Sequence, residues 1–535
     1  MRTTKLYYLL MIGFLGWNTI SCVKEINYGS DPYGLSANQV NVKFYNQPSS
    51  PSQARPGDQV TYKISGLAEV NINELDFFVN NNLTQIVSNT DSTITVLLPE
   101  DVSTGSARME YKGQIFAGPI TPIIGKVAID QTFNAGTGAI GGINTIKRLS
   151  NGQFFLGGNF TDYNGNTSLG EINGLARITS TGEFVSGMSF GEAAKSGSVS
   201  DILELPDGKI LISGNFNKYD KDENVRSLAV LNNSGSLNKE SVTVLNLTDD
   251  PEKGTLIVPT FNGGIAGAVL KTFLHDQKLT VVGNFTQYTS NYYPRSTYNN
   301  ILRDYFRFNN VLRLNLDGSL DSTYLVKNDV FPKRGTFGVN GSIQDVVIGD
   351  DGSIVMVGSF TRFDNSVDAS RILKLKSNGE VDANFVAKAD NSIMKIVPTA
   401  NGKYFLLGSF LNFNGQRVNN IVLVNADGSI DSSFTAQTFA GGIPNYLAVL
   451  NNGLILVTGT FNKYNNVIRE GLMVLNPDGS LAKGYNNSGK FVGNVQDSFI
   501  GTNSIGQPTI TLVGYISSFN GNENVGNIIR LTIQD

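Results

Sequence analysis

The stretch from Ile354 to Phe360 has the sequence IVMVGSF: four apolar residues, a glycine, a small polar residue and an aromatic ring. A short apolar run of this kind predicts a strand that is buried on both faces. Six further stretches share this pattern. They are Phe154–Phe160 (FFLGGNF), Ile210–Phe216 (ILISGNF), Leu279–Phe285 (LTVVGNF), Tyr404–Phe410 (YFLLGSF), Ile455–Phe461 (ILVTGTF) and Ile510–Ile516 (ITLVGYI). Recurrence every roughly 50 to 75 residues indicates a repeat architecture.

The residues on either side of Ile354–Phe360 predict a unit of four antiparallel strands. Gln344–Ile348 comes before it, and Arg371–Leu375 and Val381–Phe385 follow, with Asp-Gly and Asn-Gly turns between neighbours. Such turns supply the positive φ that tight hairpins require. Seven units of four strands predict a seven-bladed β-propeller. We expect the recurring glycine to allow close strand packing and the following aromatic ring to fill the space between blades.

The two ends of the repeat region predict how the ring closes. The chain stops shortly after Leu531-Thr532-Ile533, which is the third strand of the last unit. Ile129–Phe133, just before the first unit, is similar to the predicted fourth strands Ile430–Phe434 and Val381–Phe385. An N-terminal strand that completes the last blade would leave no exposed sheet edge.

The units resemble the bacterial delta-60 repeat family over residues 126–535. The matching features are an Asp-Gly-Lys turn at Asp207–Lys209, the seven glycine-containing strands, and Asp-Gly-Ser turns such as Asp427–Ser429 followed by an Asp-x-x-Phe segment. The third unit departs from the pattern with Asp276-Gln277 in its first turn, and the seventh lacks the final turn. This resemblance implies a propeller and no single activity.

A smaller β domain is predicted over residues 37–125. Val60, Tyr62 and Ile64 alternate with polar residues, as do Ile94 and Val96, which is typical of half-buried strands. About seven short strands in this span predict an Ig-like sandwich. The Pro56-Gly57-Asp58 turn, the Thr-Ile-Thr-Val strand before Leu98-Pro99, and the later Thr104-Gly105 resemble IPT/TIG domains. The fold class is therefore all-β, an Ig-like sandwich followed by a propeller.

The N-terminus has the features of an export signal. Arg2 and Lys5 precede an apolar run from Leu6 to Trp17, too short to span a bilayer as a stable helix. Ser21 before Cys22 resembles a bacterial lipobox, although Thr19 stands where the family has Leu. The resemblance implies a signal peptide over residues 1–21, lipidation of Cys22 and a tether over 22–36. The alternative is an ordinary secretory peptide with an incidental cysteine.

This order of segments looks like that of Bacteroidetes lipoproteins, which often occur near glycan-uptake systems. We therefore expect an outer-membrane protein, exposed at the cell surface and anchored to the membrane by its lipid. Outer-membrane uptake proteins or glycans are the implied partners. One Cys and one His, His275, argue against disulfides, a Cys/His zinc cluster and a Cys–His dyad. A net charge of −4 without a Lys/Arg-rich run argues against nucleic-acid binding.

The strongest candidate for a binding site is the long segment from Thr286 to Asn309 in the third unit. Loops on a rigid scaffold often carry function, and this one combines aromatic rings with arginines, which suits sugars or a protein partner. The candidate ligand-binding residues are Tyr288, Tyr292, Tyr293, Arg295, Tyr298, Arg303 and Tyr305. A second insertion, from Asn238 to Ala268, is expected on the same face of the ring. The alternative is that the rings only pack the loop onto the propeller.

Three residues, Asp220, Asp222 and Asn224, are spaced as alternate oxygen ligands for Ca²⁺, the one cofactor considered. A solvated charged loop is the alternative, since the glycine and distal glutamate of an EF-hand are absent. His275 has no evident catalytic partner and is expected to be structural. No catalytic residues are predicted, because Asp residues recur mainly in turns.

These observations favour a non-catalytic, lipid-anchored envelope protein that binds a glycan or an envelope protein through the variable-loop face of the propeller. Two alternatives remain open. One is a propeller glycan hydrolase or lyase, which clustered carboxylates in the central channel would favour. The other is a structural spacer, which a flat, polar face would favour.

Overall fold

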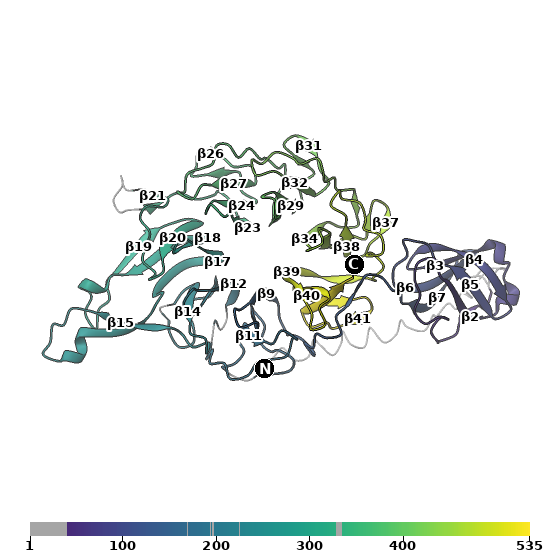
Figure 1. The fold of residues 1–535 in the computed structure, drawn as a ribbon, viewed down its shortest axis with the longest axis horizontal. Coiled ribbons are helices and arrows are strands. Elements are labelled where there is room, and N and C mark those ends of the chain that lie inside the picture. The colour runs from purple at the N-terminus through teal and green to yellow at the C-terminus, as the bar shows by residue number, and fades with distance from the viewer. Residues whose placement is uncertain are drawn as a thin grey trace, which may run out of the picture.

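The structure is a computed structural model that describes residues 40–534 apart from 168–169, 193, 195–196, 224 and 328–333. The predicted signal peptide, Cys22 and the tether over 22–36 lie outside these described residues. Figure 1 shows a ring of β-sheets with a separate β domain at one end of the long axis. Within the described part of the chain, none of the helices has the length and apolar character needed to cross a membrane.

The N-terminal domain is a two-layered sandwich. Its strands are β1 (Lys43–Phe44), β2 (Gln59–Ser65), β3 (Leu75–Val79), β4 (Asn82–Thr90), β5 (Thr93–Leu97), β6 (Gly105–Tyr111) and β7 (Gln114–Thr121), with short 3-10 turns at Leu67–Glu69 and Ile72–Glu74. The first part of β4 pairs with β3 and the remainder with β5, so this strand passes from one layer to the other. Tyr62 packs on Phe77 across the layers, with ring centroids 4.9 Å apart.

Seven sheets of antiparallel strands form the ring, which confirms the predicted blade number. The inner strands are β9 (Ile143–Arg148), β12 (Ser198–Glu204), β17 (Gly263–His275), β23 (Ile343–Ile348), β28 (Ile393–Pro398), β34 (Pro444–Val449) and β39 (Phe491–Thr502). The middle strands are β10 (Phe154–Gly158), β13 (Ile210–Asn215), β18 (Lys278–Asn291), β24 (Ile354–Gly358), β29 (Tyr404–Gly408), β35 (Ile455–Gly459) and β40 (Pro508–Phe519). The third strands are β11 (Leu175–Ile178), β14 (Leu228–Leu231), β20 (Val311–Asn315), β27 (Ile372–Leu375), β32 (Ile421–Val424), β38 (Leu472–Leu475) and β42 (Ile528–Ile533).

The recurring glycine has the same structural role in every blade. Each inner strand carries a β-bulge that places one extra residue opposite the middle strand, for example Gln344 between Ile343 and Asp345. The bulge directs a backbone carbonyl at the glycine, so that a Cβ on Gly358 would lie 2.0 Å from the oxygen of Ser342. The corresponding distances in the other six blades are 2.0 to 2.3 Å. Any larger residue would therefore have to displace the inner strand.

The aromatic residue that follows each glycine is buried between blades, as the sequence predicts. Phe360 and Phe410 are fully buried and pack with apolar residues of two adjacent sheets. Ile516 replaces the ring in blade seven and is equally buried. These residues form part of an apolar layer that holds neighbouring sheets together around the ring.

The predicted fourth strand is wrong in detail, because in six blades it is reduced to a single bridge. In blade four only Val381 pairs with Leu375. The next residue, Asp382, turns the chain out of the sheet: its Oδ1 atom accepts a hydrogen bond of 3.1 Å from the backbone N–H of Asn384. A short polar side chain that bonds to backbone two residues ahead competes with continued strand pairing.

The ring closes through the N-terminal strand β8 (Val127–Ile129), which pairs antiparallel with Leu531–Ile533 of β42. The closing strand lies slightly earlier than the predicted Ile129–Phe133. Asp130 forms the same turn as Asp382, with its Oδ1 atom 3.0 Å from the backbone nitrogen of Thr132. The closure itself, and with it the propeller, is confirmed.

The N-terminal domain is joined to blade six by several hydrogen bonds. The backbone N–H of Thr104 donates to the carbonyl of Asn487 at 2.9 Å, and the Asn487 amide donates to Val102 at 2.8 Å. Arg469 is buried in the contact and donates to the Asp101 carbonyl at 3.1 Å. Burial lowers the pKa of Arg469 to about 10, which leaves it protonated at neutral pH.

Candidate functional site

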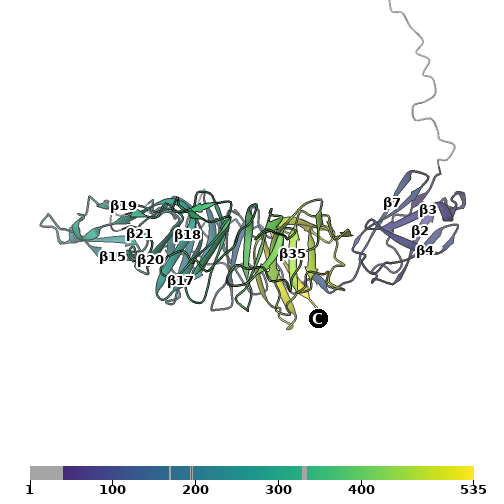
Figure 2. The same cartoon turned by 90° about the horizontal axis from the view of Figure 1, so that it is seen from above.

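The two insertions associated with blade three form one projection, defined here as residues 238–262 and 286–310. It contains the hairpin of β15 (Lys239–Thr243) and β16 (Thr255–Pro259), and the strand β19 (Arg303–Arg307), which pairs with the end of β18. Figures 1 and 2 show β15 and β19 extending outward from the rim of the ring, at the end opposite the N-terminal domain. The two insertions therefore share one place in the fold, as the sequence predicts.

The direction of the projection differs from the prediction that it covers a face of the ring. β17 and β18 stay paired far beyond the blade, up to the pair Gly263 and Ser290. A β-bulge between Ala266 and Gly267 bends this long hairpin. The insertions begin at its far end and consequently lie outside the rim.

Hydrogen bonds hold the two halves of the projection together. The backbone N–H of Leu245 donates to the Ser296 carbonyl at 2.8 Å, and the Asn262 amide donates to the Tyr293 hydroxyl at 2.5 Å. Burial raises the pKa of Tyr293. One part of this half-buried ring therefore packs within the projection, and the other part is exposed at its surface.

The candidate residues of the projection divide into buried and exposed groups. Tyr288 is buried in the core and its hydroxyl donates to the Gly318 carbonyl, so the structure removes it from the predicted ligand-binding set. The reason is that residue 288 lies within β18, opposite Ile265, and not in a loop. The exposed members of the set are Tyr292, Arg295, Tyr298, Arg303 and Tyr305.

Large apolar side chains gather on the same projection. Leu247 and Tyr305 are 78% and 60% exposed, far above the usual level for such residues. The exposed large apolar residues here are Leu245, Leu247, Ile257, Tyr292, Tyr298, Leu302 and Tyr305. Apolar groups that contribute nothing to the ring core are typical of an interaction surface.

The carboxylates of the candidate calcium loop are already used by groups of the protein. Asp220 Oδ1 accepts a hydrogen bond of 3.0 Å from the backbone N–H of Glu192, and Asp222 forms an ion pair of 3.3 Å with Lys239. Asn224 lies outside the described residues. Among the described residues, no group of three or more His, Cys, Asp or Glu side chains could hold a metal ion. Asp220 and Asp222 therefore both have protein partners in this structure.

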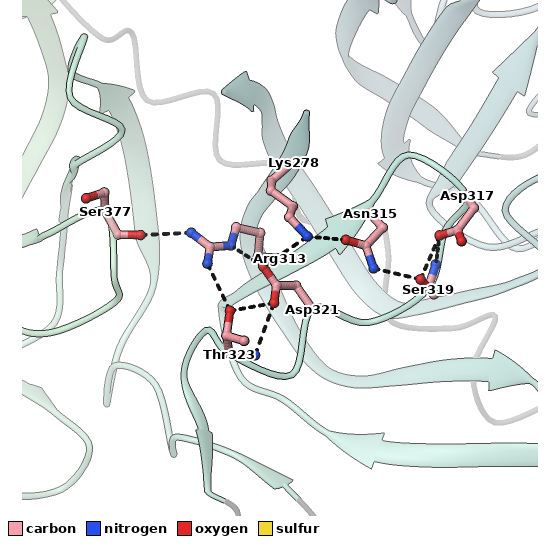
Figure 3. Close-up of polar contacts among 8 residues, drawn as sticks. All are labelled: Lys278, Arg313, Asn315, Asp317, Ser319, Asp321, Thr323 and Ser377. Atoms are coloured by element: carbon pink, nitrogen blue, oxygen red, sulfur yellow. Dashed lines mark hydrogen bonds and ion pairs between the residues drawn. The ribbon is translucent and has the colours of Figure 1, made fainter. Parts of the chain in front are cut away.

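The recurring aspartates between third and fourth strands stabilise turns, as Figure 3 shows for blade three. Asp317 accepts hydrogen bonds from the backbone and hydroxyl of Ser319 at 2.9 and 2.6 Å. Asp321 binds Thr323 in the same way and forms an ion pair of 2.8 Å with Arg313, whose guanidinium also donates to Ser377 of blade four. Burial raises the pKa of Asp321, but the bonds from Thr323 and Arg313 outweigh it and lower the pKa overall.

A ring of polar residues around the central channel is a second candidate site. In every blade, the residue directly after the inner-strand bulge belongs to this polar belt. Its members are Thr145, Asp201, Lys271, Asp345, Lys395, Tyr446 and Asp497. The bulge repeats in all seven blades, which places these residues at one level of the channel.

The aspartates of the polar belt join neighbouring blades. Asp497 accepts hydrogen bonds of 3.0 Å from the backbone N–H of Ile146 and from the hydroxyl of Thr145. Asp201 binds Thr272 in the same manner at 2.8 and 2.9 Å. Burial and the charge of Asp497 raise the pKa of Asp201 despite these bonds. By accepting these hydrogen bonds, the two carboxylates connect the inner strands of neighbouring blades.

Asp345 is held by lysines from both neighbouring blades. Lys271 donates to Asp345 Oδ1 at 2.6 Å, and Lys395 lies 3.6 Å from Oδ2. The backbone N–H of Ile396 adds a hydrogen bond of 3.1 Å. Burial raises the pKa of Asp345, but the two ammonium groups outweigh it, so the pKa lies below its ordinary value.

A cavity of about 440 Å³ lies in the central channel next to the polar belt. The inner strands of blades three to seven line it. Lys271, Lys395, Tyr446 and Asp497 supply its polar lining. The apolar lining comes from the later parts of the same strands, including Phe273, Ile348, Val397, Val449 and Ile500. Because inner strands run toward the short first turn, the cavity lies on the short-turn side of the channel.

The polar belt was not predicted from the sequence. A charged residue at the belt position in five of the seven short apolar inner strands is the signal that could have revealed it, as in QDVVI around Asp345 and MKIVP around Lys395. The spacing also repeats: Asp345 precedes Gly358 by the same number of residues as Lys395 precedes Gly408. The register that brings these residues together depends on the bulges, which the strand pattern does not show.

Comparison with protein families gives matches to both parts of the chain. Residues 19–119 match the model described as "Domain of unknown function (DUF5008)". Residues 205–239, 298–324, 350–385, 399–434 and 450–481 match "Domain of unknown function (DUF5122) beta-propeller", which covers parts of blades two to six. Comparison with curated proteins gives no match. The resemblances to IPT/TIG domains and delta-60 repeats stay predictions.

Comparison with solved structures gives matches that include several proteins from Bacteroides. An auxiliary nutrient binding protein of Bacteroides thetaiotaomicron is 12% identical, with 92% of this chain and 99% of that chain covered and a TM-score of 0.31. A putative phosphatase of the same species is 9% identical, with 92% and 97% covered and a TM-score of 0.34. A putative 6-phosphogluconolactonase of Bacteroides uniformis is 13% identical, with 71% and 96% covered and a TM-score of 0.35.

Proposed function

We propose that the protein is a non-catalytic, lipid-anchored protein of the bacterial outer membrane whose blade-three projection binds another envelope protein. The observation that carries the proposal is the set of exposed tyrosine, leucine and isoleucine side chains on the part of the chain that extends outside the rim of the ring. Tyrosine and arginine are enriched among the residues that dominate protein–protein binding. Tyr298, Tyr305 and Arg295 are exposed there together.

A protein partner accounts for the projection better than a glycan does. Sugar rings need aromatic faces with hydrogen-bonding groups beside them, and binding sites for small ligands are concave. The projection instead extends away from the ring and exposes aliphatic side chains such as Leu247 and Ile257. Aliphatic side chains gain from burial against an apolar protein surface and add little to sugar recognition.

The position of the projection supports the same proposal. The N-terminal domain and the projection lie at opposite ends of the molecule (Figures 1 and 2). A lipid on Cys22 would anchor the end that carries the N-terminal domain and leave the projection available to a partner. Glycan hydrolysis by channel carboxylates is less well supported, because Asp201, Asp345 and Asp497 are engaged by neighbouring blades.

The partner surface can be tested by photo-crosslinking in cells, with a benzoyl-phenylalanine placed at Tyr305. The matched control is the same residue at Leu411, which is 40% exposed in blade five. We expect a discrete cross-linked protein from position 305 and not from 411. Once purified, that protein should bind the chain about tenfold more weakly when Tyr298→Ser and Leu247→Ser are introduced.

Equal cross-linking from both positions would contradict the partner surface. Glycan-array binding that Tyr298→Ser abolishes would assign the surface to a sugar instead. The anchor has a separate test: Cys22→Ser should lose metabolic labelling with an alkyne fatty acid and leave the outer-membrane fraction.

A further inference from the structure

The cavity in the central channel has the features of a ligand site that is separate from the projection. Its volume of about 440 Å³ falls within the range of about 300–1,000 Å³ that is common for small-molecule sites. Five inner strands supply its lining, so its shape is set by the rigid part of the ring. A few polar groups at one level and apolar walls beyond them are the usual composition of such sites.

Both lysines of the cavity keep hydrogen-bonding capacity. An ammonium group has three N–H donors. Lys271 uses two of them, on Asp345 Oδ1 at 2.6 Å and on the Val346 carbonyl at 3.1 Å. Lys395 donates to the Gln496 carbonyl at 3.4 Å and lies 3.6 Å from Asp345. Within the described chain, each ammonium therefore has at least one N–H donor without a hydrogen-bond acceptor, although the Lys395 ammonium also lies 5.1 Å from the centroid of the Tyr446 ring.

Asp345 and Asp497 balance the charge of the two lysines, but the lysines keep open donors toward the cavity. Asp345, whose side chain is only 4% exposed, lies behind the two lysines and does not line the cavity. The lysine side chains are 33% and 20% exposed. Asp497 does line the cavity, but its oxygens already accept hydrogen bonds from Ser498, Ile146 and Thr145. The unsatisfied polar capacity is thus mainly that of cationic donors.

The lysines are also close enough to act together. They contact the two different oxygens of a single carboxylate, that of Asp345, from the blades on either side. The carboxylate of a bound ligand could accept a hydrogen bond from a remaining N–H donor of each lysine. Beyond this point, Phe273, Val397 and Val449 present apolar surface, which would favour a hydrocarbon portion of the ligand.

We propose that the channel cavity binds a small organic carboxylate with an apolar body, its carboxylate against Lys271 and Lys395 and its body along the apolar walls. This site lies on the short-turn side of the channel and does not depend on the projection. The protein would then hold two kinds of partner at two independent places.

The test is calorimetric titration of the full-length chain with hexanoate. Hexanamide has the same chain without the charge, and acetate has the charge without the chain. Because charge and apolar contact both contribute, hexanoate should bind about tenfold more tightly than either. Equal binding of hexanoate and hexanamide, or no binding of hexanoate, would overturn the proposal.

Two variants locate the bound ligand. Lys395→Met removes the ammonium group and keeps the apolar stem, and should weaken hexanoate binding about fivefold or more while leaving hexanamide unchanged. Lys376→Met is the matched control, since Lys376 is exposed and outside the cavity. Val449→Trp should block both ligands by filling the cavity without a change in charge. Unchanged hexanoate affinity in a folded Lys395→Met or Val449→Trp chain would refute the site.

Discussion

Blades three and five have the same inner half and different outer halves. Lys271 and Lys395 follow the inner-strand bulge in the two blades and reach the same carboxylate from opposite sides. Gly283 and Gly408 face a backbone carbonyl at 2.2 and 2.3 Å from where a Cβ would lie. After the middle strand, blade five makes a short hairpin of β30 (Asn412–Phe413) and β31 (Gln416–Arg417), whereas blade three carries part of the projection.

The difference shows which part of this fold tolerates a long insertion. Inner and middle strands contact both neighbouring blades, so each position there is constrained by packing. The connection after the middle strand lies at the outside: in blade five it buries Phe413 in the ring and leaves residues 414–417 exposed. A long insertion in a surface connection adds little loop entropy, which explains how blade three could gain a projection without loss of the ring.

Substitution of the recurring glycine, which the two blades share, should have the strongest effect on stability. Gly283→Ala and Gly408→Ala should each lower the free energy of unfolding by about 3 kcal/mol, because the added Cβ overlaps the bulged strand. Urea denaturation would measure it. Gly402→Ala is the control: Gly402 has φ +70° and open space around it, so only strain of about 1 kcal/mol is expected. Equal losses at Gly402 and Gly408 would mean that the bulge does not set the constraint.

The next effect concerns the carboxylate between these blades. Asp345→Asn should lower the free energy of unfolding by about 2 kcal/mol at neutral pH, because two lysines lose their anion. This value is below that of a fully buried ion pair, since both lysines are partly exposed and screened by water. The pKa of Asp345 is lowered in the folded chain. Its contribution is therefore present above the ordinary pKa of 3.8 and is lost as the pH falls through the folded value.

Denaturation of wild type and Asp345→Asn between neutral and acidic pH would measure this difference. Asp201 is the matched position. Its pKa is raised in the folded chain, so its contribution to stability changes with pH in the opposite direction. Its contribution is present below pH 3.8 and is lost as the pH rises through its folded pKa. Asp201→Asn should therefore be tolerated better at neutral pH than Asp345→Asn. A larger loss for Asp201→Asn would contradict the assigned charges.

Substitutions in the outer halves of the two blades should have the weakest effect on stability. Tyr305→Ser on the projection and Leu411→Ser in blade five replace exposed apolar side chains. Both should change the free energy of unfolding by less than about 0.5 kcal/mol, because neither side chain is part of a core. Thermal unfolding would test this. A large loss for Tyr305→Ser alone would show that the projection packs as part of the ring.

Much of the fold follows from sequence because its signals are local. The apolar strand with glycine and an aromatic ring, the Asp-Gly and Asn-Gly turns, and the similarity between Ile129–Phe133 and later segments predict seven blades and their closure. Each depends on side-chain periodicity or on turn chemistry within a few residues. The shortened fourth strand was missed because Asp382 can either continue a strand or turn the chain, and local pattern does not decide between them.

Local sequence patterns were enough to establish the class of each strand, the repeat and the composition of the projection. Three features depend on how the chain packs in space: Tyr288 is buried, the projection leaves from the rim, and Lys271, Asp345 and Lys395 meet. The reason is physical: these three residues come from separate blades. Their meeting depends on how bulges set the register of each inner strand and on how the sheets pack around the channel.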